Sequence, residues 1–232
     1  MSDKIIIYDA SCPMCRWYTG AFVRHGLLAP GDRISFSDLS DHDLCRQLDL
    51  RRAPNEIPLV DRNGGRTLYG VEAMLHLLGR KLPWLPILVQ IRPLRWLAQR
   101  SYKFISYNRR TIAPSKKQFR GLDCTPDFNW FYRSLYLITS GTAAFCLLPH
   151  PLYLFGLLPV VALLLPALPE QRMEWLGQVS TTLLIAGLLY FPLSLLPVSA
   201  WVASLVAAGV IVWQVARRWS IFRFNSPSHR PA

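Results

Sequence analysis

Residues 5–15 read Ile-Ile-Ile-Tyr-Asp-Ala-Ser-Cys-Pro-Met-Cys, an apolar run followed by an acidic residue and two cysteines. The β-branched run at residues 5–7 favours a short buried strand. Cys12 and Cys15 are three residues apart, so on a helix they lie on one face. The first turn of a helix stabilises an anion through its unpaired N–H groups and its dipole. The stretch therefore predicts a strand, a turn and a helix that begins with a redox-active dithiol.

The residues after the dithiol continue the pattern of a small α/β domain. The expected elements are a helix over 16–25, a strand over 33–37, a short helix over 41–50, a hairpin over 55–70 and a helix over 71–82. The hairpin prediction rests on the Asn63-Gly64 turn between two short strands. The first strand, helix and second strand should form a parallel βαβ unit. This is the element order of the thioredoxin fold.

Pro58 stands at the start of the third expected strand. In thioredoxin-like proteins a cis-proline at this point faces the dithiol across the substrate groove. The alternative is a trans proline at the first residue of a strand, where its missing N–H does no harm. We expect a cis bond between Ile57 and Pro58, with Pro58 lining the groove.

Charge is distributed unevenly along the 232 residues. Residues 1–120 carry 20 of the 26 Lys and Arg and 10 of the 14 Asp and Glu, whereas residues 121–232 carry 6 and 4. Long apolar runs fill most of the second half, and about 17–20 apolar residues suffice to cross a bilayer. We therefore expect an α/β redox domain over 1–120, including a basic juxtamembrane helix, and an all-α membrane domain over 121–232.

Four transmembrane helices are expected in the second half. They lie at about 134–148, 152–168, 179–196 and 199–216, with a polar loop over 169–178. The first two are short and proline-broken, so a re-entrant hairpin is the alternative. The connections at His150 and Pro197 contain no Lys or Arg, whereas the segments before the first span and after the last are basic. The positive-inside rule then places the redox domain and both termini in the cytoplasm. The first residues also lack the apolar core of a signal peptide.

Residues 80–120 carry eleven Lys and Arg and no acidic residue. Positive charge beside a membrane span attracts anionic lipid, so lipid is the expected partner of this block and nucleic acid is not. Residues 94–108 form a basic amphipathic pattern within it. Such a helix either lies on the membrane surface, with Trp96 and Tyr102 at head-group depth, or packs on the sheet. Both alternatives are open.

The five cysteines are odd in number and unevenly spaced, which argues against a disulfide scaffold and favours a reducing compartment. A Cys-x-x-Cys pair can also be half of a zinc site, but zinc needs four ligands and the other Cys and His residues lack ligand spacing. We expect neither a metal nor a cofactor. Cys45 is interpreted as a small buried apolar residue. Cys124, just ahead of the membrane, and Cys146, within the first span, are interpreted as ordinary membrane-helix residues, the alternative being a relay of electrons to or from a membrane quinone or a partner.

The motif Asp9-Ala10-Ser11-Cys12-Pro13-Met14-Cys15 resembles the Asp-x-x-Cys-x-x-Cys signature of the DCC family of thiol–disulfide oxidoreductases. The similarity continues through 68–74, 92–95, Tyr102 and Asn108-Arg109, and covers about residues 4–110. It implies a thioredoxin-like fold and dithiol exchange, with Cys12, Cys15 and Asp9 in the active site. It says little about residues 121–232.

The expected reaction is thiol–disulfide exchange with a protein disulfide or a small thiol. Cys12, the cysteine expected to be more exposed, attacks as a thiolate and Cys15 resolves the mixed disulfide. Asp9 either relays the proton of Cys15 or is only a helix cap or turn residue. The sequence thus predicts a membrane-anchored protein-disulfide oxidoreductase. A membrane electron-transfer component and a non-catalytic thioredoxin-like binding module are the alternatives.

Overall fold

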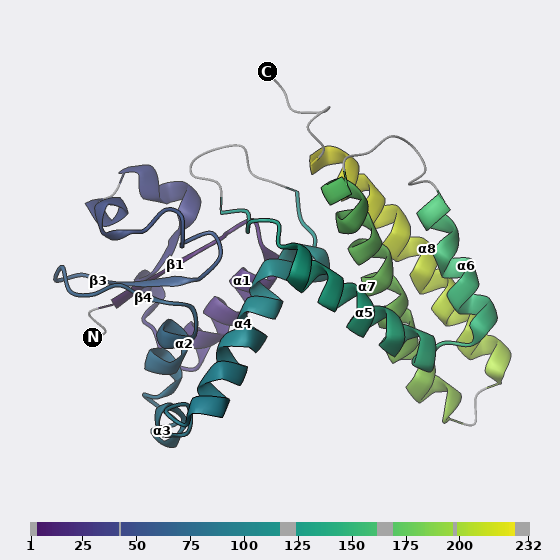
Figure 1. Ribbon diagram of the computed structural model, residues 1–232, viewed down its shortest axis with the longest axis horizontal. Coiled ribbons are helices and arrows are strands. Elements are labelled where there is room, and N and C mark those ends of the chain that lie inside the picture. The colour runs from purple at the N-terminus through teal and green to yellow at the C-terminus, as the bar shows by residue number, and fades with distance from the viewer. Residues whose placement is uncertain (1–3, 42, 117–123, 162–168, 197–198, 226–232) are drawn as a thin grey trace. The chain divides into compact units, whose positions relative to one another are not determined.

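The computed structural model describes residues 4–41, 43–116, 124–161, 169–196 and 199–225 (Figure 1). The chain divides into two compact units. Unit 1 consists of Met1–Arg109 and Lys117–Asp127, and unit 2 of Arg110–Lys116 and Phe128–Ala232. Each unit is described by itself, and the functional division at residue 120 stays a prediction.

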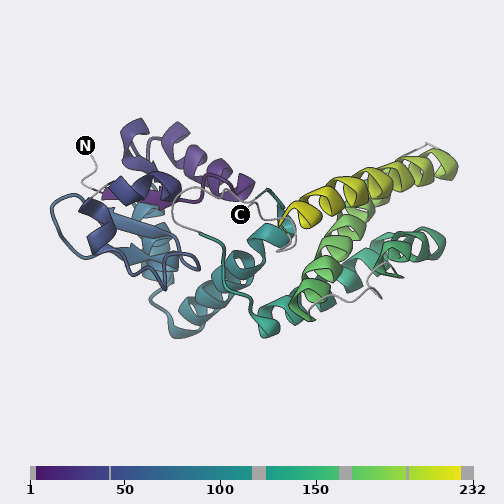
Figure 2. The ribbon, with the colours of Figure 1, turned by 90° about the horizontal axis from the view of Figure 1, so that it is seen from above.

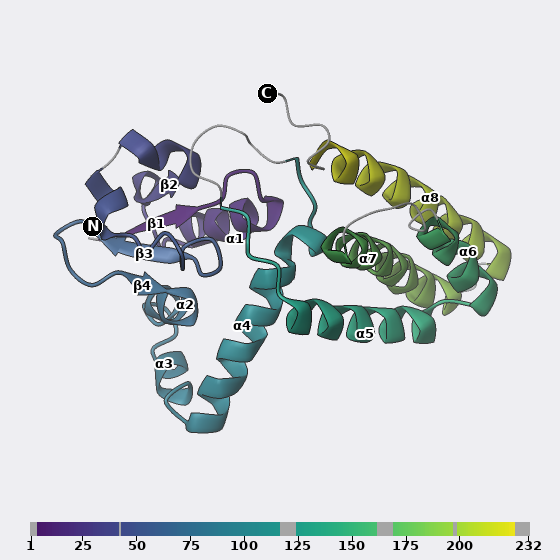
Figure 3. The ribbon, with the colours of Figure 1, turned by 45° about the horizontal axis from the view of Figure 1, so that its top comes forward.

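Unit 1 is built on a four-stranded sheet with the order β2-β1-β3-β4 (Figure 3). The strands are β1 (Lys4–Tyr8), β2 (Arg33–Ser35), β3 (Pro58–Asp61) and β4 (Leu68–Tyr69). β1 pairs in parallel with β2, Ile7 lying opposite Ile34, and antiparallel with β3, Ile5 lying opposite Val60. β3 and β4 pair antiparallel. The parallel βαβ unit and the hairpin expected from the sequence are confirmed.

The side chains of β1 alternate between two hydrophobic clusters, one on each face of the sheet. Ile5 and Ile7 pack with Phe36, Leu39 and Val60 on one face. Ile6 packs on the other face, against side chains of α1 (Pro13–Arg24) and α2 (Gly70–Leu78). All three isoleucines are at most 4% exposed. Each contributes about 1.5–3 kcal/mol by this burial, so the run that leads to the dithiol is also the centre of the core.

Two of the expected helices differ from the structure. The helix predicted over 41–50 is replaced by short 3-10 segments, η2 (Phe36–Asp41) and η3 (Asp43–Gln47), and another 3-10 turn, η1 (Pro30–Asp32), precedes β2. Aspartate and serine, which favour turns and caps over helix interiors, are frequent in the sequence of residues 35–43. The helix predicted over 71–82 ends at Leu78, because Gly79 is a poor helix former and Pro83 follows. The helices α3 (Trp84–Leu88) and α4 (Arg92–Ile112) come next, and α4 passes from unit 1 into unit 2 at Arg110.

The Ile57–Pro58 bond is trans, so the expected cis bond is wrong: the described chain contains no cis peptide bond. Pro58 is buried as the first residue of β3 and pairs with Tyr69 of β4. The backbone N–H of Gly70 donates to the carbonyl of Ile57. A proline at the first position of a strand leaves the rest of the ladder intact, which explains its place here.

Unit 2 is helical (Figure 2). Its helices are α5 (Trp130–Leu147), α6 (His150–Val161), α7 (Pro169–Ser194) and α8 (Ala200–Asn225). α7 contacts α5, α6 and α8, and contributes Trp175, Val179 and Leu183 to the core of the unit. The polar loop expected over 169–178 is instead the first part of α7. Its polar side chains find partners inside the unit: Glu174 pairs with Arg133 at 2.7 Å, and Gln178 accepts a hydrogen bond from Arg218 at 2.6 Å.

Two helices of the described chain, α7 and α8, are long and apolar enough to cross a membrane, judged by length and composition. α5 and the described part of α6 do not meet the same test. The end of the second expected span, residues 162–168, lies outside the described residues. Two of the four predicted spans are therefore supported.

Candidate functional site

The start of α1 brings together the two cysteines of the predicted dithiol. Cys12 is the N-cap of α1, and Pro13 is its first residue, a position that proline favours. The sulfur of Cys12 accepts a hydrogen bond from the backbone N–H of Cys15 at 3.5 Å. Both thiols are free. A sulfur thus occupies the place that a serine or aspartate oxygen usually takes at a helix start.

The two thiols differ in acidity. A hydrogen bond from the Cys15 side chain lowers the pKa of Cys12 most, burial opposes it, and the Cys15 backbone N–H and the charge of Arg109 lower it further, to about 6. The pKa of Cys15 is raised well above its ordinary value, because its thiol donates to Cys12 and is buried. At neutral pH Cys12 is therefore a thiolate and Cys15 a protonated thiol. This difference fits the predicted roles of attacking and resolving cysteine.

Neither thiol is exposed in this structure. Cys12 is 0% exposed and Cys15 3%, so the expectation that Cys12 is the more exposed is wrong. The sulfur of Cys12 lies over the first turn of α1, where it accepts the hydrogen bond from the Cys15 N–H. In this position it faces away from solvent. Exchange with a protein disulfide therefore requires a local opening that exposes the Cys12 sulfur.

Asp9 follows the last residue of β1 and is 5% exposed. Its Oδ1 accepts hydrogen bonds from the Ser11 backbone N–H at 2.9 Å and the Ser11 hydroxyl at 2.6 Å, which holds the turn into α1. The helix cap is Cys12 and not Asp9. The charge of Asp9 raises the pKa of both cysteines. The structure thus shows a turn role for Asp9, and its proton-relay role stays a prediction.

Arg109 is a site residue that the sequence reasoning missed. Its side chain, on α4, is 7% exposed, and its Nη2 lies 3.8 Å from Asp9 Oδ2. The same nitrogen lies 3.6 Å from the sulfur of Cys124 and donates to the Cys124 carbonyl. Its charge lowers the pKa of Cys12. The one signal in the sequence was its place in the Asn108-Arg109 pair of the family resemblance, which gave no reason to prefer it over the ten other basic residues of 80–120.

The remaining cysteines lie in different parts of the chain. Cys124 is 8% exposed and packs in the cluster of Ile5 and Ile7, and Cys45 is partly buried against the same cluster. Cys146 is exposed on α5, in unit 2. Cys124 lies in unit 1 and outside the helices, so its interpretation as a membrane-helix residue is wrong. Cys146 lies on α5, the helix of the first expected span, and its interpretation as an ordinary residue of that helix stays a prediction, as does the relay alternative.

Two partly buried tyrosines lie near the dithiol. Tyr102 of α4 accepts a hydrogen bond from the backbone N–H of Ile57 at 2.9 Å. Burial is the main cause that raises the pKa of Tyr102, to about 12. Burial also raises the pKa of Tyr18 of α1 well above its ordinary value, and the charge of Cys15 adds to this. Both phenols therefore stay protonated at neutral pH, and Tyr102 attaches α4 to the residue before Pro58.

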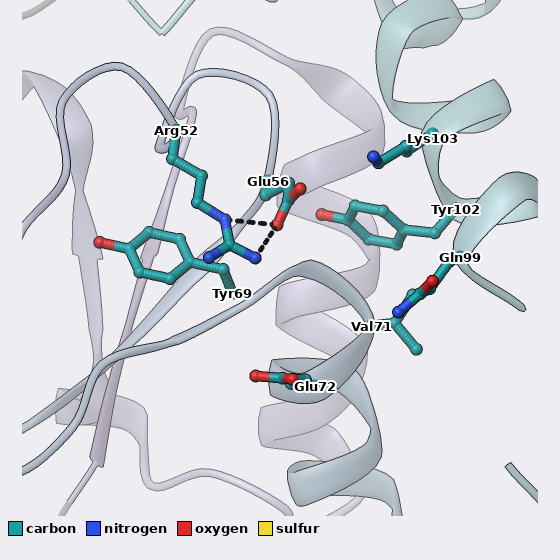
Figure 4. Close-up of a pocket in the computed structure, with 8 residues that line it drawn as sticks. All are labelled: Arg52, Glu56, Tyr69, Val71, Glu72, Gln99, Tyr102 and Lys103. Atoms are coloured by element: carbon teal, nitrogen blue, oxygen red, sulfur yellow. Dashed lines mark hydrogen bonds and ion pairs between the residues drawn. The ribbon is translucent and has the colours of Figure 1, made fainter. Parts of the chain in front are cut away.

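A polar pocket of about 140 Å³ lies between residues 52–56, the junction of β4 with α2, and α4 (Figure 4). Arg52 lies between the Tyr69 ring, 4.7 Å from its centre, and the carboxylate of Glu56, 2.8 Å away (Figure 4). Tyr102 and Lys103 line the side that α4 contributes. Neither Pro58 nor a cysteine of the dithiol lines this pocket, and the groove expected at Pro58 stays a prediction.

In the part of the chain that the structure describes, no group of three or more His, Cys, Asp or Glu residues is placed to hold a metal ion. The zinc alternative for Cys12 and Cys15 therefore gains no support. The chemistry available to the site is that of the two thiols, the carboxylate of Asp9 and the guanidinium of Arg109.

A comparison with protein families bears directly on this dithiol. Residues 6–114 match the family model described as DCC1-like thiol-disulfide oxidoreductase. The match includes Asp9, Cys12, Cys15 and Arg109, whereas Cys124 and helices α5 to α8 lie beyond it. It supports thiol–disulfide oxidoreductase activity for unit 1. Searches of curated proteins and of solved structures gave no match.

Proposed function

We propose that this chain is a membrane-anchored protein thiol–disulfide oxidoreductase with a thioredoxin-like redox domain. The observation that carries the proposal is the opposite shift of two neighbouring thiols, Cys12 toward the thiolate and Cys15 toward the thiol. The strand order β2-β1-β3-β4, with Cys-x-x-Cys directly after β1, supports the thioredoxin-like assignment. The family match supports the reaction class.

The reaction has two steps. The Cys12 thiolate attacks one sulfur of the substrate disulfide, forms a mixed disulfide and releases the other substrate sulfur as a thiolate, which takes up a proton. Cys15 then loses its proton and attacks the Cys12 sulfur, so that a Cys12–Cys15 disulfide forms and the second substrate thiolate leaves and is protonated. Two electrons pass from the dithiol to the substrate, and with an oxidised dithiol the same steps run in reverse.

The hydrogen bond between the two thiols explains how Cys15 becomes reactive only in the second step. While Cys12 is a thiolate, the Cys15 thiol donates to it, and this is the main cause of its raised pKa. Once Cys12 is part of a mixed disulfide, its negative charge is gone and the pKa of Cys15 falls. Asp9 is the proposed acceptor of the Cys15 proton, and Arg109 the proposed charge that holds the Cys12 thiolate.

Pro58 and its strand partner Tyr69 form the proposed wall of the substrate groove. In the pocket beside Tyr69, Arg52 pairs with Glu56, and Glu72 pairs with Arg66. We infer that this wall meets the polar backbone of a disulfide-containing protein or a small thiol.

A Cys15→Ser variant is expected to trap substrates. Cys12 still forms the mixed disulfide, but serine cannot resolve it, so substrates stay attached to the chain. Mass spectrometry of non-reduced complexes isolated from cells measures this. A Cys12→Ser/Cys15→Ser variant is the matched control and should trap nothing. Equal recovery of thiol-bound partners by both variants, or of none by Cys15→Ser, would overturn the exchange mechanism.

Membrane anchoring is proposed from unit 2. α7 and α8 are long enough to span, and α8 exposes large apolar side chains such as Trp201, Leu205 and Trp213, each at least 61% exposed. Apolar surface on this scale is what lipid covers in a membrane protein. We propose that unit 2 is integral, and that the basic segments before and after it place unit 1 and both termini in the cytoplasm.

The orientation can be tested with single exposed cysteines. In a Cys146→Ser background, Asn63→Cys places a thiol on the exposed β3–β4 turn, and Trp201→Cys places one at the start of α8. A membrane-impermeant thiol reagent applied to intact cells is expected to label Trp201→Cys and not Asn63→Cys until the cells are opened. Labelling of Asn63→Cys in intact cells would reverse the assignment.

A further inference from the structure

The segment from α3 to the first half of α4 exposes an unusual number of large apolar side chains. Seven of them are between 39% and 64% exposed: Trp84, Ile87, Leu88, Ile91, Leu94, Trp96 and Leu97. Every residue from 90 to 97 is exposed. In Figure 3, α3 and the start of α4 lie together on the far side of α2 from the sheet. An apolar surface of this kind on a folded unit marks an interaction site.

The second half of α4 makes the contacts that hold this helix on unit 1, and the first half stays exposed. Tyr102 is hydrogen-bonded by the Ile57 backbone, Ser106 donates to the Asn55 carbonyl, and Arg109 lies in the dithiol site. These contacts fix α4 to unit 1 over 102–109. The two sequence-based alternatives for this helix therefore apply to different parts of it: it packs on unit 1 in its second half and presents its first half outward.

The exposed apolar side chains are surrounded by positive charge. Lys81, Arg92, Arg95, Arg100 and Lys103 are exposed in and beside these helices. Arg100 lies over the Trp96 ring, 5.6 Å from its centre. Residues 73–122 contain no acidic side chain, and the nearest carboxylate in sequence, Glu72, faces Arg66 and Arg95. Aromatic and aliphatic side chains flanked by Lys and Arg are typical of helices that lie at the interface of an anionic bilayer.

The position of this surface in the chain favours a bilayer as its occupant. The chain passes from unit 1 into unit 2 within α4, at Arg110, a few residues after the exposed first half of the helix. With unit 2 in the membrane, as proposed above, the surface is confined to the neighbourhood of the bilayer, and this covalent link turns docking into an intramolecular step.

We propose that α3 and the first half of α4 dock unit 1 on the surface of an anionic bilayer, with Trp84 and Trp96 at head-group depth. This interaction does not involve the thiols, so it holds or fails independently of the redox proposal. Its role is to set how unit 1 faces the membrane.

The test uses the full chain in nanodiscs of phosphatidylcholine with phosphatidylglycerol, part of which carries brominated acyl chains. A fluorophore is attached to Ile91→Cys in the Cys146→Ser background, and Asn63→Cys on the β3–β4 turn serves as the matched control in the same unit. The Cys146→Ser chain, without an added cysteine, is treated with the same fluorophore to measure the background labelling of its native cysteines. Bromine quenching is expected at position 91 and not at 63. In discs of phosphatidylcholine alone, the quenching at position 91 should fall.

Charge removal provides the second arm. An Arg92→Gln/Arg100→Gln variant should weaken docking about fivefold for each charge removed, read as loss of quenching at position 91. Equal quenching at positions 91 and 63, or quenching that is independent of phosphatidylglycerol and of these arginines, would overturn the proposal. A fluorescence shift at position 91 that grows with protein concentration, without bromine quenching, would assign the surface to a second copy of the chain instead.

Discussion

In a Cys146→Ser background, which removes the exposed thiol of α5, a Cys12→Ser variant is expected to lose disulfide exchange by at least about 30-fold at pH 7, because an ordinary thiol is only a few per cent thiolate there. The wild-type thiol, with a pKa of about 6, is ionised at neutral pH. A serine hydroxyl is not ionised there and cannot form a disulfide. Single-turnover reduction of a small aromatic disulfide by the pre-reduced protein measures the rate. A small substrate is chosen because its rate depends less on the local opening that exposes the Cys12 sulfur.

Cys146→Ser is the matched control for this experiment, because Cys146 is exposed on α5 in unit 2. It removes one thiol and should react at the wild-type rate. If the Cys12→Ser chain also reacted at that rate, the enzymatic proposal would fail and the binding-module alternative would stand.

An Arg109→Met variant is expected to change both the reactivity of Cys12 and the stability of unit 1. The positive charge lowers the pKa of Cys12, so its removal raises that pKa from about 6 toward the ordinary thiol value. The pH profile of Cys12 alkylation by iodoacetamide should shift to higher pH, and exchange at pH 6–7 should slow. Removing one charge of a buried ion pair also costs up to about 3–5 kcal/mol, and both side chains of this pair are at most 7% exposed. Denaturant unfolding measures this loss.

Three variants separate these effects. Arg109→Lys retains the charge and should leave the alkylation profile closest to wild type. Asp9→Asn/Arg109→Met removes both charges and should recover part of the lost stability in a double-mutant cycle. Arg100→Met removes an exposed charge of the same helix and should leave Cys12 unaffected. An alkylation midpoint near pH 6 in folded Arg109→Met would show that Arg109 does not stabilise the thiolate.

Local sequence patterns correctly predicted the strand, the hairpin turn and the helix start that surround the dithiol. The isoleucine run became β1, the Asn63-Gly64 turn lies in the β3–β4 hairpin, and Cys12 and Cys15 stand at the start of a helix. In each case the deciding interaction spans only a few residues, so the signal is present in a short window. The α-helix expected over 41–50 is a local prediction that was wrong: the chain forms a 3-10 segment there, in a stretch whose sequence is rich in aspartate and serine.

The hydropathy of the sequence predicted that the second half of the chain is helical. It did not predict that polar side chains pair inside that half. Residues 169–178 were expected to form a loop because they are polar, yet they begin α7. Glu174 meets Arg133, and Gln178 meets Arg218, on neighbouring helices. A window of sequence cannot reveal that the partner of a polar side chain is 40 residues away.

The sequence by itself determined the dithiol, its place after the central strand and the division into a charged and an apolar half, because each depends on neighbours in the chain. Only the tertiary structure showed that Cys12 is buried, that Arg109 is its cation and that the two halves of α4 have different surroundings. Arg109 is 100 residues from Asp9 and belongs to a run of similar basic residues. Only folding selects which of those charges is buried beside the dithiol, where it adds to the hydrogen bonds from Cys15 in lowering the pKa of Cys12.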